Sequence, residues 1–133
     1  EPLASLDPLA RREFLHVLVE AVHADGATAL LSSHVITDIE QACDRLLVLG
    51  SGSVLLDVSI QEAVASHRVV TVGPESVAPE PEIVGRFPGP TGERLALVRS
   101  REDGRAATLE EVVLGHLAAG RLPRAKPADE VAA

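Results

Sequence analysis

Two stretches of the sequence decide the predicted fold: EPLASLDP at positions 1–8 and TALLSSHV at positions 28–35. The first ends in Asp-Pro, a typical helix start, because aspartate accepts hydrogen bonds from the free N–H groups of the first turn and proline is favoured at the first helical position. The apolar spacing that follows predicts a helix from Pro8 to Ala24, which stops at Gly26. The second stretch opens with an apolar run, TALLSS, which predicts a buried strand.

The elements that follow alternate between helix and strand. A capping box at Thr37–Glu40 predicts a second helix. The apolar runs Arg45–Leu49 and Ser53–Val58, separated by the turn Gly50–Gly52, predict a β-hairpin. A short helix is expected over Ile60–His67. Because strand, helix and strand occur in that order, the pattern predicts an α/β fold with a βαβ unit and a mostly parallel sheet.

The last third of the chain has a different composition. Residues 73–82, GPESVAPEPE, are rich in proline and glutamate, as linkers are. Two strands are then expected, at Glu82–Phe87 and at Arg94–Ser100. A final helix is expected over Thr108–Ala119, opened by a second capping box at Thr108–Glu111.

These patterns divide the chain into three parts. Residues 1–72 form the main α/β part, and residues 73–119 form a small α+β extension. Residues 120–133 lack periodicity and are expected to be a disordered tail.

Composition excludes several classes of function. The formal net charge of −8 argues against binding to nucleic acid. No apolar run approaches the ~20 residues of a membrane span, so we expect a protein of the cytosol. The single cysteine, Cys43, forms no intramolecular disulfide, and the histidines at positions 16, 23, 67 and 116 have no spacing that suggests a metal site, so we expect none.

Glu1 and His34 are the candidate catalytic residues. His34 follows the predicted strand directly, and ligands of open α/β sheets gather at the carboxyl ends of strands. Pro2 disfavours a helical conformation at Glu1 and keeps that residue extended. A carboxylate and an imidazole on the same crevice can polarise a water for attack on phosphorus. Each residue alone has a plainer explanation, a solvated chain start and a loop histidine, so these features alone predict an α/β domain and only suggest a phosphate site.

The combination of these segments resembles one known family. Glu1–Pro8 resembles the segment of ABC ATPases that runs from the catalytic glutamate into the D-loop, and Ser32–Val35 resembles their switch-histidine loop. Glu40–Arg45, followed by two apolar strands, is similar to the next elements of that family. The spacing of 33 residues from Glu1 to His34 also fits. The resemblance covers about the first half of the chain.

The final helix adds a second resemblance. Thr108–Leu117, TLEEVVLGHL, is similar to the closing helix of ATPase subunits from ABC-2-type exporters. Val113 stands where those subunits usually have an aromatic residue, so this part of the pattern differs.

The resemblance implies a role for each site residue. Glu1 would polarise the hydrolytic water, and His34 would contact that water and the γ-phosphate of ATP. Ser5 and Asp7 would belong to the D-loop, which crosses the interface between two nucleotide-binding domains. The fold implied is the C-terminal part of a RecA-like P-loop nucleotide-binding domain, beginning at the catalytic glutamate.

The resemblance also implies cofactors and partners. ATP and Mg²⁺ would be the cofactors, and a membrane permease would be the partner, with the ATPase acting as a homodimer or heterodimer. The subunit would power transport, in the direction of export, from the cytoplasmic face of the cell membrane.

Several parts of such an ATPase are missing from this sequence. It has no G-x-x-x-x-G-K-[ST] phosphate loop, and its only lysine is Lys126. The aspartate that supports Mg²⁺, the glutamine loop and the signature motif are absent too. We therefore expect the 133-residue chain alone to be inactive and marginally stable, and a longer parent to be active. Two alternatives stay open: an ABC ATPase that acts on nucleic acid or ribosomes, and a non-enzymatic truncated remnant.

Overall fold

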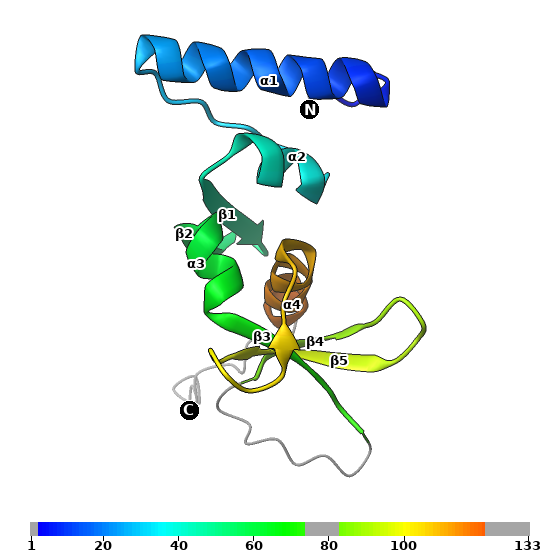
Figure 1. Cartoon of the computed structure of the whole chain (residues 1–133). Coiled ribbons are helices and arrows are strands. Elements are labelled where there is room, and N and C mark those ends of the chain that lie inside the picture. Colours follow the sequence, from blue (N-terminus) through cyan, green and yellow to red (C-terminus); the bar gives the residue numbers. More distant parts are fainter. Residues whose placement is uncertain (1–2, 74–82, 122–133) are drawn as a thin grey trace, which may run out of the picture.

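The computed structural model describes residues 3–73 and 83–121. Its elements are arranged in tiers (Figure 1). The long helix α1 (Pro8–Asp25) lies at one end beside the short helix α2 (Ile36–Ala42), a β-hairpin follows, and a sheet that carries helix α4 (Leu109–Arg121) lies at the other end. No helix in the two described ranges is both long enough and apolar enough to cross a lipid bilayer.

Helix α1 begins and ends where the sequence predicts. Asp7 caps its start, because one carboxylate oxygen of Asp7 accepts hydrogen bonds from the backbone N–H groups of Leu9 and Ala10, both at 3.0 Å. Gly26 follows the last turn with φ 60°, the left-handed conformation that glycine adopts without steric cost.

The predicted hairpin is confirmed. Strand β1 (Arg45–Gly50) pairs with strand β2 (Ser53–Ser59) in antiparallel register. Ser51 and Gly52 connect them with φ 51° and φ 75°. Two consecutive residues with positive φ give a turn whose twist matches that of the flanking strands.

A second, four-stranded sheet follows helix α3 (Ile60–Ala65). It contains β3 (His67–Thr71), β4 (Ile83–Pro88), β5 (Arg94–Arg99) and β6 (Arg105–Ala106), in the order β4-β5-β3-β6. Every pair in this sheet is antiparallel.

Helix α4 packs across this sheet and closes the hydrophobic core. The helix can approach closely because glycines lie at the contact: a Cβ on Gly85 would collide with the backbone of Gly115, and a Cβ on Gly115 would collide with the side chain of Leu97. Helix α2 and strand β1 contribute Ile39 and Leu46 to the same core. The largest fully buried side chains are Leu97, Leu109, Val69 and Val112.

The predicted strand over Thr28–Ser33 does not form. The segment is irregular, and Leu30 is 94% exposed. A strand needs a neighbour that accepts and donates its backbone hydrogen bonds, and no described strand pairs with this segment. The βαβ unit is therefore wrong for the described residues, and the parallel sheet is not confirmed, since all their strand pairs are antiparallel. The chain is a mixed α/β protein with antiparallel sheets.

Of the two predicted capping boxes, only the second forms. At the start of α4, Glu111 N–H donates to the Thr108 hydroxyl at 3.2 Å and Thr108 N–H donates to the Glu111 carboxylate at 2.9 Å. Helix α2 instead begins at Ile36, one residue before the expected start, and its cap residue Val35 makes no side-chain capping bond. The Ser33 hydroxyl accepts the Val35 N–H, which fixes the chain before Thr37.

Other predicted boundaries shift by a few residues. Helix α3 ends at Ala65, and His67 begins β3 rather than ending the helix. Helix α4 continues through Gly120 to Arg121, so these two residues are helical and not part of a tail. The remainder of the predicted linker and tail lies outside the described residues, and the division into three parts stays a prediction.

Candidate functional site

The segment that follows Glu1 is described from Leu3 onward, and it forms a turn before α1. Leu3 is buried, with 4% of its surface exposed, and its carbonyl accepts the Leu6 N–H at 3.2 Å. Ser5 is exposed on this turn, and Asp7 is exposed but engaged as the cap of α1. The turn is thus anchored through an apolar side chain and through the helix that it precedes.

An arginine connects this turn to helix α2. One terminal N–H of Arg11 donates to the Leu3 carbonyl at 2.9 Å. The Nε of the same guanidinium lies 3.9 Å from a carboxylate oxygen of Asp38. Asp38 is 3% exposed, so this ion pair is shielded from water on its acidic side. Arg11 therefore contacts both the turn after Glu1 and the helix after His34.

Asp38 in turn contacts the loop that carries His34. The Ser33 hydroxyl lies 3.5 Å from the Asp38 carboxylate and accepts the Val35 N–H at 3.0 Å. Ser33 and Val35 are the two neighbours of His34 in sequence, so both flanks of the histidine are tied to α2. His34 itself is exposed.

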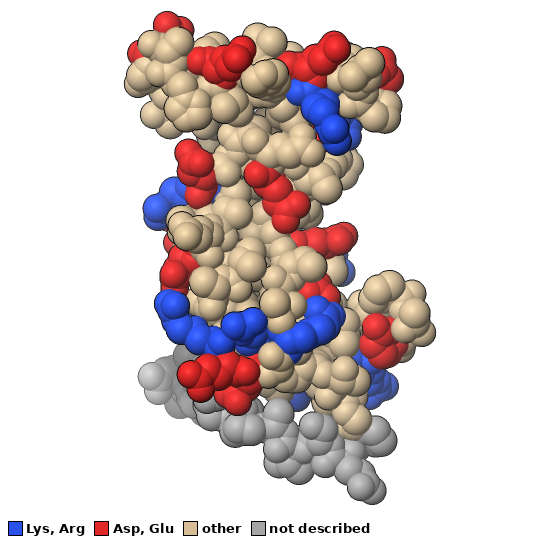
Figure 2. Space-filling view, in the orientation of Figure 1, with Lys and Arg blue, Asp and Glu red and all other residues tan. Residues whose placement is uncertain are grey.

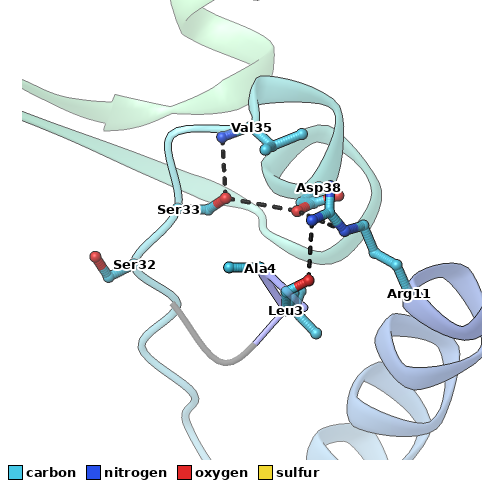
Figure 3. A pocket seen from close by; sticks show the side chains of 7 residues that line it. All are labelled: Leu3, Ala4, Arg11, Ser32, Ser33, Val35 and Asp38. Carbon is cyan, nitrogen blue, oxygen red and sulfur yellow. Dashed lines mark hydrogen bonds and ion pairs between the residues drawn. The ribbon is translucent and has the colours of Figure 1, made fainter. Parts of the chain in front are cut away.

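Figure 3 shows that the two segments line one small hollow. Leu3 and Ala4 come from the turn before α1, and Ser32 and Ser33 come from the loop before α2. Arg11 reaches in from α1, and its guanidinium lies between Leu3 and Asp38. The hollow lies at the point where the two predicted motifs meet.

The turn before α1 and the loop before α2 lie together, but the structure does not describe every predicted side chain. Glu1 lies outside the described residues, two positions before Leu3. The roles assigned to Glu1, Ser5, Asp7 and His34 therefore stay predictions.

Sequence reasoning missed a second cluster, made of two buried histidines. His67 on β3 and His116 on α4 are 3% and 4% exposed, and their Nε2 atoms lie 3.1 Å apart. His67 Nδ1 donates to the Ala63 carbonyl at 2.7 Å, so its Nε2 is the acceptor for the Nε2–H of His116. Burial lowers the pKa of both imidazoles, that of His116 to about 4. No local signal could have paired residues 49 positions apart.

Basic side chains gather in a band across the end of the molecule that holds the four-stranded sheet (Figure 2). Arginines of this part of the chain are already engaged: Arg101 pairs with Glu62 at 2.8 Å, and Arg105 pairs with Glu111 at 2.6 Å. Arg68 donates to the Arg101 carbonyl. These contacts join the sheet to α3 and α4, so they have a structural role.

No group of three His, Cys, Asp or Glu side chains within residues 3–73 and 83–121 is placed to hold a metal ion. Lys126 lies outside those residues. Binding of Mg²⁺ and the phosphates of ATP would need groups from elsewhere.

Comparisons with known proteins agree with the resemblance. The chain is 40% identical over 67 residues to the thiamine import ATP-binding protein ThiQ of Jannaschia sp. (strain CCS1). It is 33% identical over 81 residues to the uncharacterized ABC transporter ATP-binding protein sll0415 of Synechocystis sp.. It is 35% identical over 71 residues to the bacitracin transport ATP-binding protein BcrA of Enterococcus faecalis. The chain is related to ABC transporter ATP-binding proteins.

The relationship covers part of each protein. The three matches take in 50%, 59% and 53% of this chain. The chain spans 29% of the length of the ThiQ protein and 23% of each of the other two ABC relatives. No protein-family model and no solved structure matches the chain.

Proposed function

We propose that this chain is the C-terminal part of an ATP-hydrolysing subunit of an ABC transporter. The observation that carries the proposal is the shared hollow, where the turn after Glu1 meets the loop before His34. The relatives support it, because their names are those of ATP-binding proteins of transporters, including one for thiamine import and one for bacitracin transport.

In this proposal Glu1 and His34 act on the terminal phosphate of ATP. Glu1 polarises the attacking water, and the imidazole of His34 contacts that water and the γ-phosphate. Mg²⁺ and the groups that hold the other phosphates come from outside the described residues. Ser5 and Asp7, which are exposed on the turn before α1, lie at the interface between two nucleotide-binding domains.

The transport role adds a permease and a location. The subunit works as a dimer, bound to a membrane permease on the cytoplasmic face of the membrane. Export is the proposed direction, and it rests on the resemblance of Thr108–Leu117, which begins α4, to the closing helix of ATPase subunits from ABC-2-type exporters.

The test uses the longer subunit that the proposal implies, one that contains residues 1–133. We expect Glu1→Gln and His34→Ala each to lower the rate of ATP hydrolysis by about 100-fold or more, because each removes a group that acts on the attacking water. Glu13→Gln and His16→Ala are matched controls, since both side chains are exposed on α1. These controls should keep the wild-type rate.

The outcomes separate the alternatives. Hydrolysis that persists unchanged in both Glu1→Gln and His34→Ala contradicts the proposal. Hydrolysis without co-purification of a membrane permease favours an ATPase with no role in transport. The 133-residue chain alone should show no ATP turnover, and measured turnover would contradict that expectation.

A further inference from the structure

We propose that Arg11 and Asp38 form a positioning pair that holds the turn after Glu1 in register with the loop of His34. The inference rests on the proposed function, since register between these segments matters only where both act on one phosphate. Neither side chain is assigned contact with the nucleotide. Their contribution is to set the distance between Glu1 and His34, the two groups that are assigned contact with the nucleotide or the attacking water.

The first half of the link runs from Arg11 to the turn. Arg11 lies in the first turns of α1, and its backbone N–H donates to the carbonyl of the cap residue Asp7 at 2.9 Å. Its guanidinium reaches back to the carbonyl of Leu3, whose side chain is buried. A rigid helix start and a buried anchor thus fix the position of the Leu3 backbone, two residues after Glu1.

The second half runs from Asp38 to the loop. Asp38 lies in the first turn of α2, and its backbone N–H donates to the Val35 carbonyl at 3.1 Å. Its carboxylate faces Ser33, which in turn holds the Val35 N–H. A shift of Asp38 would therefore move the backbone on both sides of His34.

The two halves of the link meet in the ion pair between Arg11 and Asp38, in which each charge depends on the other. Within the described residues, the buried Nε of Arg11 has no hydrogen-bond partner, and the Asp38 carboxylate is its acidic neighbour at 3.9 Å. A buried carboxylate is strongly disfavoured without a compensating cation. Loss of either charge is thus expected to displace the other side chain and to loosen the connection between α1 and α2.

Loss of this alignment between the two segments should lower the turnover rate of ATP hydrolysis more than the affinity for ATP. The groups that bind the adenine and the other phosphates lie outside this link, so ATP binding stays nearly intact. A displacement of about 1 Å between reacting groups can cost about 100-fold in rate. In the ATPase-competent subunit, we expect Arg11→Gln and Asp38→Asn each to lower kcat by about 10- to 100-fold with KM for ATP changed by less than about threefold.

Further variants separate positioning from simple destabilisation. The double variant should be no slower than the slower single variant, because both changes break one link. Arg11→Lys should recover part of kcat, since it keeps the charge but lacks the fork that reaches two acceptors. Arg12→Gln is the matched control: Arg12 is the exposed neighbour on α1 and should behave as wild type. Circular dichroism should show the same helix content in every variant.

The kinetic results distinguish a failure of the positioning pair from a failure of the proposed function. If Arg11→Gln and Asp38→Asn keep the wild-type kcat while Glu1→Gln abolishes turnover, the positioning pair is wrong and the proposed function stands. A raised KM at unchanged kcat, or additive losses in the double variant, also overturns the pair. If Glu1→Gln and His34→Ala are both fully active, the proposed function fails and this inference fails with it. Should Arg11→Gln misfold, Ser33→Ala replaces it: a kcat loss supports the link, and an unchanged kcat overturns it.

Discussion

Residues 3–42 and the described residues between 45 and 121 both have elements bounded by capping residues or tight turns, but the two regions differ in burial. In the first region, α1 is an intact capped helix, yet Leu15 is its one buried residue and Leu9 remains 67% exposed. In the second region, strands and helices share a core in which Leu97 is fully buried. Capping and turn chemistry therefore determine where elements begin and end in both regions, whereas burial depends on which surfaces have a neighbour.

The two regions also differ in their roles, because one holds the candidate site and the other holds most of the hydrophobic core. The candidate site lies in the first region, where the segments are connected by the polar contacts of Arg11, Asp38 and Ser33. The buried apolar residues lie mainly in the second region. Regions with few buried apolar contacts open most easily, and moving loops at functional sites are drawn from such regions.

The largest expected effect is in the core of the second region. Leu97→Ala should lower the free energy of unfolding by about 3 kcal/mol, because it removes a fully buried side chain beneath α4 and leaves a cavity. Urea unfolding followed by circular dichroism measures this loss. Leu114→Ala is the matched control, since Leu114 is 39% exposed on α4, and it should cost less than about 1 kcal/mol. Equal losses in the two variants would contradict the assignment of the core.

The next effect is a dependence of stability on pH that originates in the second region. Burial lowers the pKa of His116 from 6.5 to about 4, with His67 and Arg99 adding to the effect. Below pH 6.5 the unfolded chain binds a proton that the folded chain does not, so the free energy of unfolding decreases as the pH falls. Between pH 7 and pH 5 we expect a loss of about 2 kcal/mol, from ~1.4 kcal/mol per pH unit below the unfolded pKa.

His116→Gln tests the origin of this loss. The variant should show a much weaker decrease between pH 7 and pH 5, whereas His16→Ala, at an exposed histidine of the first region, should retain the wild-type decrease. The hydrogen-bonded ion pair with Arg105 lowers the pKa of Glu111 below 4.5. Protonation of Glu111 therefore changes the free energy of unfolding only at a pH lower than this range. An unchanged pH dependence in His116→Gln would show that the buried pair is not its cause.

A smaller effect distinguishes the two helix caps. Asp7→Ala removes the cap of α1 and Thr108→Ala removes that of α4, and each should cost about 1 kcal/mol. Because Leu15 is the one buried residue of α1, the loss from Asp7→Ala should appear mainly as faster hydrogen exchange of the α1 amides, with a smaller decrease in the urea midpoint. The loss from Thr108→Ala should appear in the urea midpoint. A reversal of these two patterns would contradict the difference between the regions.

Much of the local structure could be predicted from the sequence because it depends on neighbours in the chain. The Asp7 cap, the Gly26 stop, the hairpin turn at Gly52 and the Thr108 capping box all follow from residues within a few positions. A strand was predicted over Thr28–Ser33 and does not form. Its absence could not be predicted, because a strand forms only where another strand pairs with it, and the sequence of the segment does not show whether one is present.

The site was predictable in part for the same reason. Its loops could be located from the order of the motifs, which places Ser32–Val35 after a helix and an apolar run. The contact of Arg11 with Asp38 joins two separate helices, and that of His67 with His116 joins a strand to a helix 49 positions away. Both depend on how elements pack, which charge and hydropathy patterns along the chain do not specify.

The smallest effect is expected where apolar side chains of the first region are exposed. Leu30→Ser should change the free energy of unfolding by no more than about 0.5 kcal/mol, because a side chain that is 94% exposed loses no buried contact. Leu15→Ala is the matched comparison in the same region: Leu15 is 2% exposed, and its loss should cost about 2 kcal/mol or more. If Leu30→Ser costs as much as Leu15→Ala, then the segment packs against another surface in solution. Repeating the unfolding at several protein concentrations would show whether a second copy of the chain supplies that surface, since only association makes the midpoint depend on concentration.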